Sequence, residues 1–294
     1  MYYMISVLIG CITAIMVAIN GKLTAGYGMF TATVIIHIVG TVFSFLLIKI
    51  QNSKTRSHGT FPRWFYLGGA IGVFTTVANN FAFGKISMTS IIALGLFGQT
   101  LTSICIDHLG LFGMPKYKFR KSNIIGFTFA AAGIVSMLDH IDMTAVIAIL
   151  FALGTGTTIV LSRTVNARLA EQIGALRGSF INHLVGLPVT VLILFLFGRK
   201  ELIHSSASFP TAPWIYIGGM FGVLIVLLCN ITAPKIQSFY MTLLTFVGQV
   251  FVGILIDILI TQNYSAATFR GGILVACGIL INLIMERRYT RSIR

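Results

Sequence analysis

Few side chains in this 294-residue chain could do chemistry, and those few are polar residues inside long apolar stretches. Two glutamines, Gln99 and Gln249, each follow a glycine near the middle of such a stretch. An amide inside a bilayer either bonds to a neighbouring helix or binds a polar solute, because an unsatisfied polar group there is costly. We expect both amides to bind substrate, and hydrogen bonding between helices is the alternative.

Two histidines and two aspartates also occupy membrane-depth or near-membrane positions. His37 and His183 lie about two turns inside their apolar stretches, and imidazole titrates near neutral pH. They suit contact with a substrate or coupling to protons. Asp107 and Asp257 lie eight residues beyond the two glutamines, which is about 12 Å along a helix. We expect them to act in gating or proton coupling near opposite membrane faces; an interfacial charge is the alternative.

Four asparagines complete the candidate site residues. Asn80 and Asn230 lie deep enough to line a substrate cavity. Asn20 and Asn166 lie where the first apolar stretch of each half ends, so they are predicted to line a vestibule or to cap a helix.

The sequence favours neither an enzyme nor a metal site. It has no P-loop, GxSxG or HExxH motif. Its four cysteines lie in apolar runs without metal-ligand spacing, so they are read as packing residues. We therefore predict no catalytic residue, no metal and no cofactor.

The composition indicates what must position these residues. Hydrophobic residues make up 56% of the chain and charged residues only 10%, against roughly 25% charged in a soluble domain. A crossing of the ~30 Å hydrocarbon core needs ~20 apolar residues. Ten segments qualify, and their length favours helices over barrel strands. The predicted fold is therefore all-α, with ten transmembrane helices at about 3–19, 29–50, 64–84, 88–107, 122–138, 143–162, 175–198, 213–233, 239–260 and 270–286.

The net charge of +14 would suggest nucleic acid in a soluble protein, but its placement argues against that partner. With a cytoplasmic N-terminus, sixteen of the 21 lysines and arginines fall in cytoplasmic loops and five outside. This matches the positive-inside rule and predicts that both termini are cytoplasmic.

The chain is an internal duplication. Asn20, His37 and Gly40 recur 146 residues later, and "WFYLGGAIGV" recurs 150 residues later as "WIYIGGMFGV". "FGQTLTSICID" likewise recurs as "VGQVFVGILID". Each half, 1–140 and 141–294, holds five predicted spans, and an odd number forces the second half to insert upside down. The loop "PKYKFRK" carries four cations, whereas its counterpart carries only Arg270, as inversion demands. Inverted repeats are typical of secondary transporters, whose site lies near the midplane between the repeats.

Three motifs carry a family resemblance. "GQTLTSICIDHLGLFGMPK", "NGKL" and "GGAIG" resemble the YdcZ-type small inner-membrane branch of the drug/metabolite transporter superfamily. The likeness covers the whole chain as a fused tandem of two five-helix halves. It implies ten helices, antiparallel halves and transport of a small molecule by alternating access. The second half departs from the pattern, since no GLFGxP follows Asp257.

The sequence thus predicts a secondary-active or facilitative transporter, an exporter or exchanger, in a bacterial cytoplasmic membrane. With few ionisable groups at the site, a small polar, zwitterionic or cationic metabolite or drug fits better than a polyanion. One alternative is a translocase of lipids or lipid-linked head groups. The other is a non-transporting membrane scaffold or sensor. The predicted partners are a small-molecule solute and the bilayer, with a homodimer as an open possibility.

Overall fold

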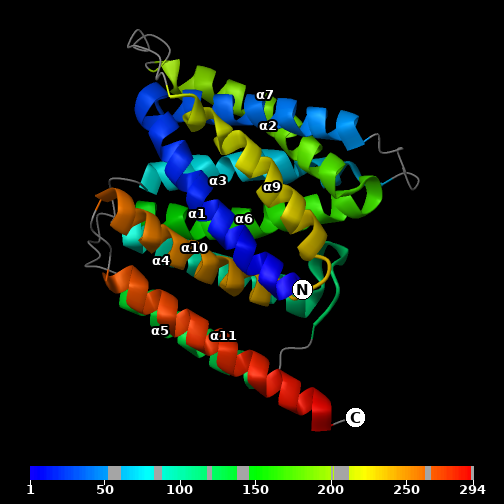
Figure 1. Ribbon diagram of the computed structural model, residues 1–294. Helices are drawn as coiled ribbons and strands as arrows, with labels where there is room; N and C mark the ends of the chain where they lie inside the picture. Colours follow the sequence, from blue (N-terminus) through cyan, green and yellow to red (C-terminus); the bar gives the residue numbers. More distant parts are fainter. Residues whose placement is uncertain are drawn as a thin grey trace.

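The computed structural model describes residues 1–51, 61–82, 88–117, 121–137, 146–199, 201, 212–261 and 266–292. The described chain is helical throughout and contains no strand. Its α-helices (Figure 1) are α1 (Tyr2–Tyr27), α2 (Met29–Gln51), α3 (Gly68–Ala82), α4 (Met88–Leu109), α5 (Lys121–Met137), α6 (Val146–Ile173), α7 (Ala175–Phe197), α9 (Gly218–Thr232), α10 (Ser238–Thr261) and α11 (Ala266–Ser292). Short 3-10 helices are η1 (Arg63–Leu67), η2 (Leu111–Gly113) and η4 (Pro213–Ile217).

These ten α-helices match the ten predicted spans one for one. Seven helical segments among the described residues are long and apolar enough by themselves to cross a bilayer. Two shorter apolar stretches lie within α5 and α11. The all-helical fold is what apolar runs of this length require, because each backbone must satisfy its own hydrogen bonds in lipid.

Two helices run well beyond their predicted ends. α1 continues to Tyr27. α6 continues to Ile173, eleven residues past its own predicted boundary. The extension of α6 stays helical because it is packed: Val165, Ala167 and Leu169 are buried in it. The helix-cap interpretation of Asn20 and Asn166 is therefore wrong, because both lie inside a helix rather than at its end.

Helices of each half pack against helices of the other half. α1 lies along α10, and α6, its equivalent in the second half, lies along α4. Glycines allow these helices to approach closely. A Cβ on Gly10 would meet the Gln249 backbone nitrogen at 2.7 Å, and a Cβ on Gly156 would meet that of Gln99 at 2.5 Å. Such paired, reciprocal contacts are what a two-fold relation between the repeats produces.

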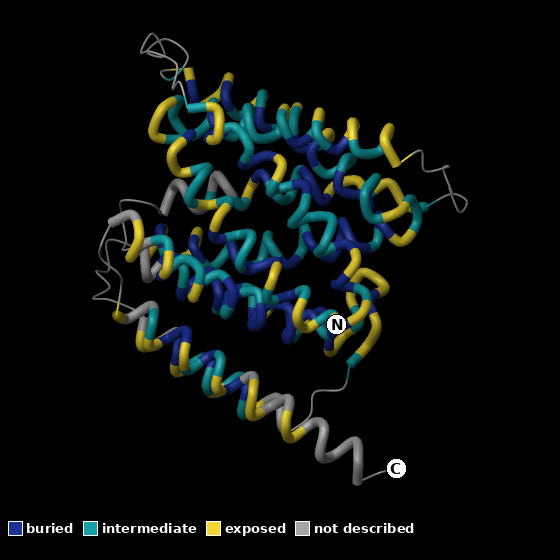
Figure 2. The backbone as a smooth tube through the Cα atoms, in the orientation of Figure 1, coloured by how far each residue is buried: buried dark blue, intermediate teal, exposed yellow. Residues whose placement is uncertain are grey.

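The last helix of each half stands apart from this core. α5 and α11 lie side by side along one edge of the molecule (Figure 1). The contact is close at Gly133, where a Cβ would lie 2.8 Å from the Gly271 carbonyl oxygen. Buried residues concentrate in the helices above this pair (Figure 2). The first four helices of each half therefore form the part of the fold that can hold a site.

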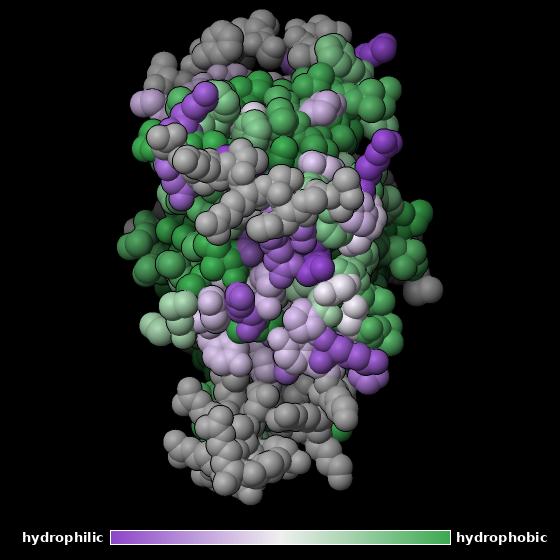
Figure 3. Space-filling model, turned by 90° about the vertical axis from the view of Figure 1, so that its right-hand side faces the viewer, coloured by the Kyte–Doolittle hydropathy of each residue, from purple (hydrophilic) through white to green (hydrophobic). Residues whose placement is uncertain are grey.

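Both termini lie at the same end of the molecule, on the right of Figure 1. This agrees with an even number of crossings. Figure 3 looks onto that end and shows hydrophilic residues gathered in the middle of the face, with apolar residues on the flanks. The turn between α6 and α7 belongs to this end, as do the ends of α2, α4 and α9.

Candidate functional site

Two histidines meet where the repeats meet. His37 on α2 and His183 on α7 have ring centroids 5.9 Å apart. Each ring fills the space left by a glycine of the other repeat, His183 against Gly40 and His37 against Gly186. A Cβ on Gly186 would lie 2.7 Å from His37 Nε2. The recurrence of histidine and glycine three residues apart is thus explained by a reciprocal contact between repeats.

The hydrogen bonds of the two rings are also equivalent. His37 Nδ1 bonds to the Thr33 carbonyl oxygen and His183 Nδ1 bonds to the Ser179 carbonyl oxygen, each at 2.9 Å. A carbonyl oxygen only accepts, so each Nδ1 carries the hydrogen. In the neutral ring, Nε2 is then left as the acceptor. The pair can therefore accept hydrogen bonds from a ligand, or take up protons.

The glutamines lie where helices of the two halves pack together, Gln99 between α4 and α6 and Gln249 between α10 and α1. Gln99 and Gln249 are near the middle of α4 and α10, and their backbones pass close to Gly156 and Gly10. Both side chains are half-buried, and neither amide hydrogen-bonds to a described residue. Helix–helix hydrogen bonding, the alternative interpretation, is therefore not seen in the described part of the chain.

Sequence reasoning missed a set of threonines around α6. Thr102 Oγ1 donates to Thr157 Oγ1 at 3.1 Å, and Thr75 and Thr158 share a hydrogen bond of 2.9 Å. These hydroxyls join α4 and α3 to α6. Threonine is common in membrane helices and none of the four has a threonine at the equivalent position of the other repeat, so the sequence contained little signal for them.

Asn166 and Asn20 lie against Gly68 and Gly218, the first residues of α3 and α9. Asn166 Nδ2 donates to Asn182 Oδ1 at 2.7 Å and to Ser162 Oγ at 3.3 Å. Its equivalent, Asn20, contacts Gly218, and its buried Oδ1 has no partner among the described residues. The two acceptors of the Asn166 Nδ2 are also missing in the first half, where Ile36 and Met16 replace Asn182 and Ser162.

Asn230 ties α9 to the first turn of α7. Its Nδ2 donates to the Ala175 carbonyl oxygen at 3.1 Å, while its Oδ1 is buried without a partner among the described residues. Its predicted counterpart, Asn80, has a side chain outside the described part of the structure, as does Asp257. Their predicted roles in substrate binding and in gating or proton coupling stay predictions.

Asp107 occupies a built polar cluster rather than a free interfacial position. Its carboxylate accepts hydrogen bonds from the backbone N–H groups of Ser238 and Phe239, both at 2.8 Å. These are the first two residues of α10, where unpaired N–H groups and the helix dipole favour a negative charge. Asp107 thus joins the end of α4 to the start of α10, between the two repeats.

A buried arginine completes this cluster and was not foreseen as a site residue. Arg163 is only 8% exposed, and its Nη2 donates to Ser238 Oγ at 2.9 Å and Thr242 Oγ1 at 3.0 Å. Thr242 in turn shares a hydrogen bond of 2.8 Å with Ser103. The predicted sixth span ends at residue 162, which counts Arg163 among the sixteen cytoplasmic loop cations. The longer α6 carries it into the core.

The loop after Asp107 explains the GLFG motif. Gly110 and Gly113 have φ of 65° and 71°, a left-handed conformation that favours glycine. The turn lets the Tyr117 N–H donate to the Asp107 carbonyl oxygen at 2.7 Å. Burial and the nearby Asp107 charge raise the pKa of the Tyr117 phenol. The second half lacks the motif and has no equivalent turn in the described residues.

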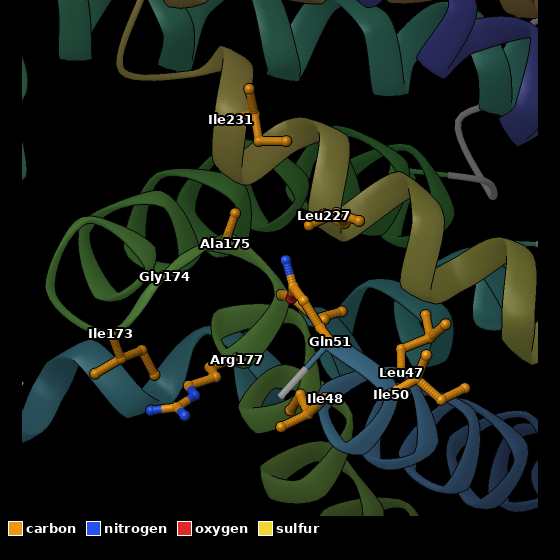
Figure 4. A pocket seen from close by; sticks show the side chains of 11 residues that line it. Leu47, Ile48, Ile50, Gln51, Ile173, Gly174, Ala175, Arg177, Leu227 and Ile231 are labelled. Carbon is orange, nitrogen blue, oxygen red and sulfur yellow. The ribbon is translucent and has the colours of Figure 1, made fainter. Parts of the chain in front are cut away.

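A groove opens at the same end of the molecule, between α2, α7 and α9. It has a volume of about 650 Å³ and is lined by Leu47, Ile48, Ile50, Gln51, Ile173, Gly174, Ala175, Leu176, Arg177, Leu227 and Ile231. Apolar side chains dominate this lining. Figure 4 shows the Gln51 side chain extending into the middle of the groove, and Arg177 on the side of Ile173.

Comparisons with known proteins agree with this architecture. A family model described as "Putative inner membrane exporter, YdcZ" matches residues 1–136 and 147–281, one block in each half. A solved structure, titled only "Crystal structure of protein", is 15% identical, with a TM-score of 0.70 over 97% of this chain and 98% of that one. That likeness shows the fold alone. No curated protein matches the chain. The chain therefore belongs to the YdcZ family of the drug/metabolite transporters, as a multi-pass inner-membrane protein with two matching halves.

Proposed function

We propose that the protein exports a small polar, zwitterionic or cationic metabolite or drug by alternating access of its two repeats. The observation that carries this proposal is the reciprocal contact of His37 and His183 at the junction of the repeats. A scaffold has little need for two equivalent imidazoles whose Nε2 atoms bond to no described residue. Rocking of one repeat on the other about this contact would expose the midplane to each side in turn.

The binding groups in this proposal are the two histidines and the amides of Gln99 and Gln249. Thr102, Thr157 and Thr158 lie on the same helices as Gln99 and its partner Gly156, and Thr75 joins α3 to them. Donors and acceptors without net charge suit a neutral or zwitterionic solute. An organic cation is also suitable, because none of these groups carries a fixed positive charge.

Transport in proteoliposomes tests the proposal. Two probes are used, ethidium as a fluorescent organic cation and radiolabelled glycine betaine as a zwitterion. We expect counterflow of at least one probe, and a loss of about tenfold or more in Gln99→Ala, Gln249→Ala and His37→Gln. Thr128→Val is the matched control, because Thr128 is an exposed α5 residue that bonds only to the Ile124 carbonyl oxygen among the described residues. Wild-type rates in both glutamine variants would remove the amides from the site.

Energy coupling is part of the same proposal. His37, His183 and Asp107 offer groups for proton coupling, and facilitated diffusion is the alternative. An imposed pH gradient across the vesicles separates them: coupled transport accelerates in one direction of the gradient, whereas facilitated diffusion ignores it.

A translocase of lipids or lipid-linked head groups is the second candidate function. The groove between α2 and α9 favours it, because Ile50 and Ile231 at its edge are 80% and 40% exposed, respectively. Transfer of a fluorescent phospholipid between leaflets, measured by dithionite quenching, would favour this function over solute export.

A further inference from the structure

The starts of α2 and α7 are equivalent positions in the two repeats. The backbone N–H groups of their first turns have different hydrogen-bond partners. At α2, the Glu201 carboxylate accepts the N–H groups of Met29, Phe30 and Thr31 at 3.0–3.1 Å. The Thr31 hydroxyl also donates to it at 3.2 Å. The protein therefore supplies its own anion to this helix start, after a glycine, Gly28, with φ of 79°.

At α7 the same turn has no such anion among the described residues. Gly174, with φ of 93°, stands where Gly28 stands in the first half, and Ala175 and Leu176 follow it as Met29 and Phe30 follow Gly28. The N–H groups of Ala175 and Leu176 donate to no described residue. Both residues line the groove instead, together with the neutral Gln51.

A second polar group at this turn also lacks a partner. Asn230 is 4% exposed, and it holds the Ala175 carbonyl oxygen while its own Oδ1 accepts nothing from the described residues. Its neighbours Leu227 and Ile231 line the groove. Asn230 thus fixes the position of the turn, and a ligand with an anionic oxygen would find the N–H groups of Ala175 and Leu176 there.

The groove itself favours an amphiphile. Its volume of about 650 Å³ lies within the ~300–1,000 Å³ range of small-molecule sites. No acidic residue lines it, and Arg177 supplies a positive charge at the same turn as the amides. The remaining walls are isoleucines, leucines and the α6–α7 turn, and Ile50 and Ile231 are open to the surroundings.

We propose that this groove binds one anionic phospholipid, with its phosphate at the first turn of α7 and an acyl chain between α2 and α9. The location favours a lipid over a soluble anion, because the groove lies at the ends of membrane helices, where head groups sit. The proposal goes beyond the export function and does not depend on it.

Native mass spectrometry of the purified full-length protein in detergent tests the site, with dioleoyl phosphatidylglycerol and dioleoyl phosphatidylcholine as probes. We expect one phosphatidylglycerol molecule to bind tightly, and phosphatidylcholine to bind with at least fivefold lower affinity. Arg177→Gln should lower the affinity for phosphatidylglycerol about fivefold. Gln51→Glu should weaken it roughly tenfold or more, because the new carboxylate repels the phosphate and can bond the free amides as Glu201 does at α2.

The matched control is Lys235→Gln, which removes one charge from the same end of the molecule outside the groove lining. The affinity of this variant for phosphatidylglycerol should stay within about twofold of wild type. Leu227→Trp, which fills the apolar part, should weaken both lipids and keeps the test independent of charge. Equal affinity for the two lipids would overturn the proposal. So would wild-type binding in a correctly folded Gln51→Glu, or displacement of the lipid by low-millimolar inorganic phosphate.

Discussion

Replacement of Asp107 by asparagine tests whether the buried cluster at α4, α6 and α10 acts as one unit. The carboxylate holds two N–H groups of the α10 first turn, and Ser238 links it to the buried Arg163. The asparagine side chain has nearly the same shape. It keeps one acceptor oxygen and removes the negative charge.

The expected loss follows from these contacts. One charge-assisted hydrogen bond, worth about 1.5–3 kcal/mol, becomes neutral, and one buried N–H group faces an amide donor instead of an acceptor, at about 1–3 kcal/mol. We therefore expect Asp107→Asn to lower the free energy of unfolding by about 3 kcal/mol. Arg163→Gln, which loses its bonds to Ser238 and Thr242, should lower it by about 2 kcal/mol.

The double variant carries the decisive information. Removing one charge leaves the other buried and uncompensated, whereas removing both restores neutrality. The double variant should therefore be less destabilised than the sum of the single variants by about 1–2 kcal/mol. Unfolding is followed by tryptophan fluorescence and circular dichroism during titration of detergent micelles with dodecyl sulfate.

Glu171→Gln is the matched control, because it makes the same carboxylate-to-amide change in an exposed pair with Arg168. That variant should lose less than about 1 kcal/mol. Additive single variants, with no coupling between Asp107 and Arg163, would refute the idea of a shared cluster. A loss in Asp107→Asn no larger than in Glu171→Gln would refute the role of Asp107 at the start of α10.

Three further predictions concern the contacts between repeats and one exposed loop. Gly186→Ala should reduce transport more than Gly72→Ala, because the new Cβ would lie 2.7 Å from the His37 ring, against 3.3 Å from the Ser162 hydroxyl at Gly72; equal rates in the two variants would contradict this. Glu201→Gln should lower the free energy of unfolding by about 1–2 kcal/mol, measured by the same titration, since it removes the charge at the start of α2. Burial and the Asp107 charge raise the pKa of Tyr117 above 10.0, so the folded state holds this proton more tightly than the unfolded state does. Stability should fall as the pH rises above about 10, and Tyr117→Phe should show a smaller fall between pH 9 and pH 11.

Hydropathy was sufficient to predict the helices, because an apolar run in lipid has few structural options. Every predicted span corresponds to an α-helix, and the repeat offsets of 146 and 150 residues correctly paired His37 with His183 as equivalent positions. The offsets do not predict that the two rings are in contact. That contact depends on α2 and α7 crossing at Gly40 and Gly186.

The main failure concerns the ends of helices. Hydropathy ends a span at the first charge, so Arg163 was placed in a loop and Asn166 at a helix end. Both lie inside α6, because packing against α3 and α4 keeps the helix intact beyond its most apolar part. A search for polar residues at helical spacing from the buried positions of α6 would have found Arg163.

The arginine cluster exists at one end of the molecule only. The positions equivalent to Arg163, Thr242 and Ser103 in the other repeat are Val17, Ile92 and Gly253, so the matching contact at the opposite end has none of these polar groups. Two closed states held by unequal contacts have unequal free energies, and a difference of only ~1.4 kcal/mol gives a tenfold ratio of populations. In the proposed alternating cycle, we therefore expect the substrate-free protein to rest mostly with the Arg163 end closed. A solute at that end would then bind only to the minority of molecules in which this end is open.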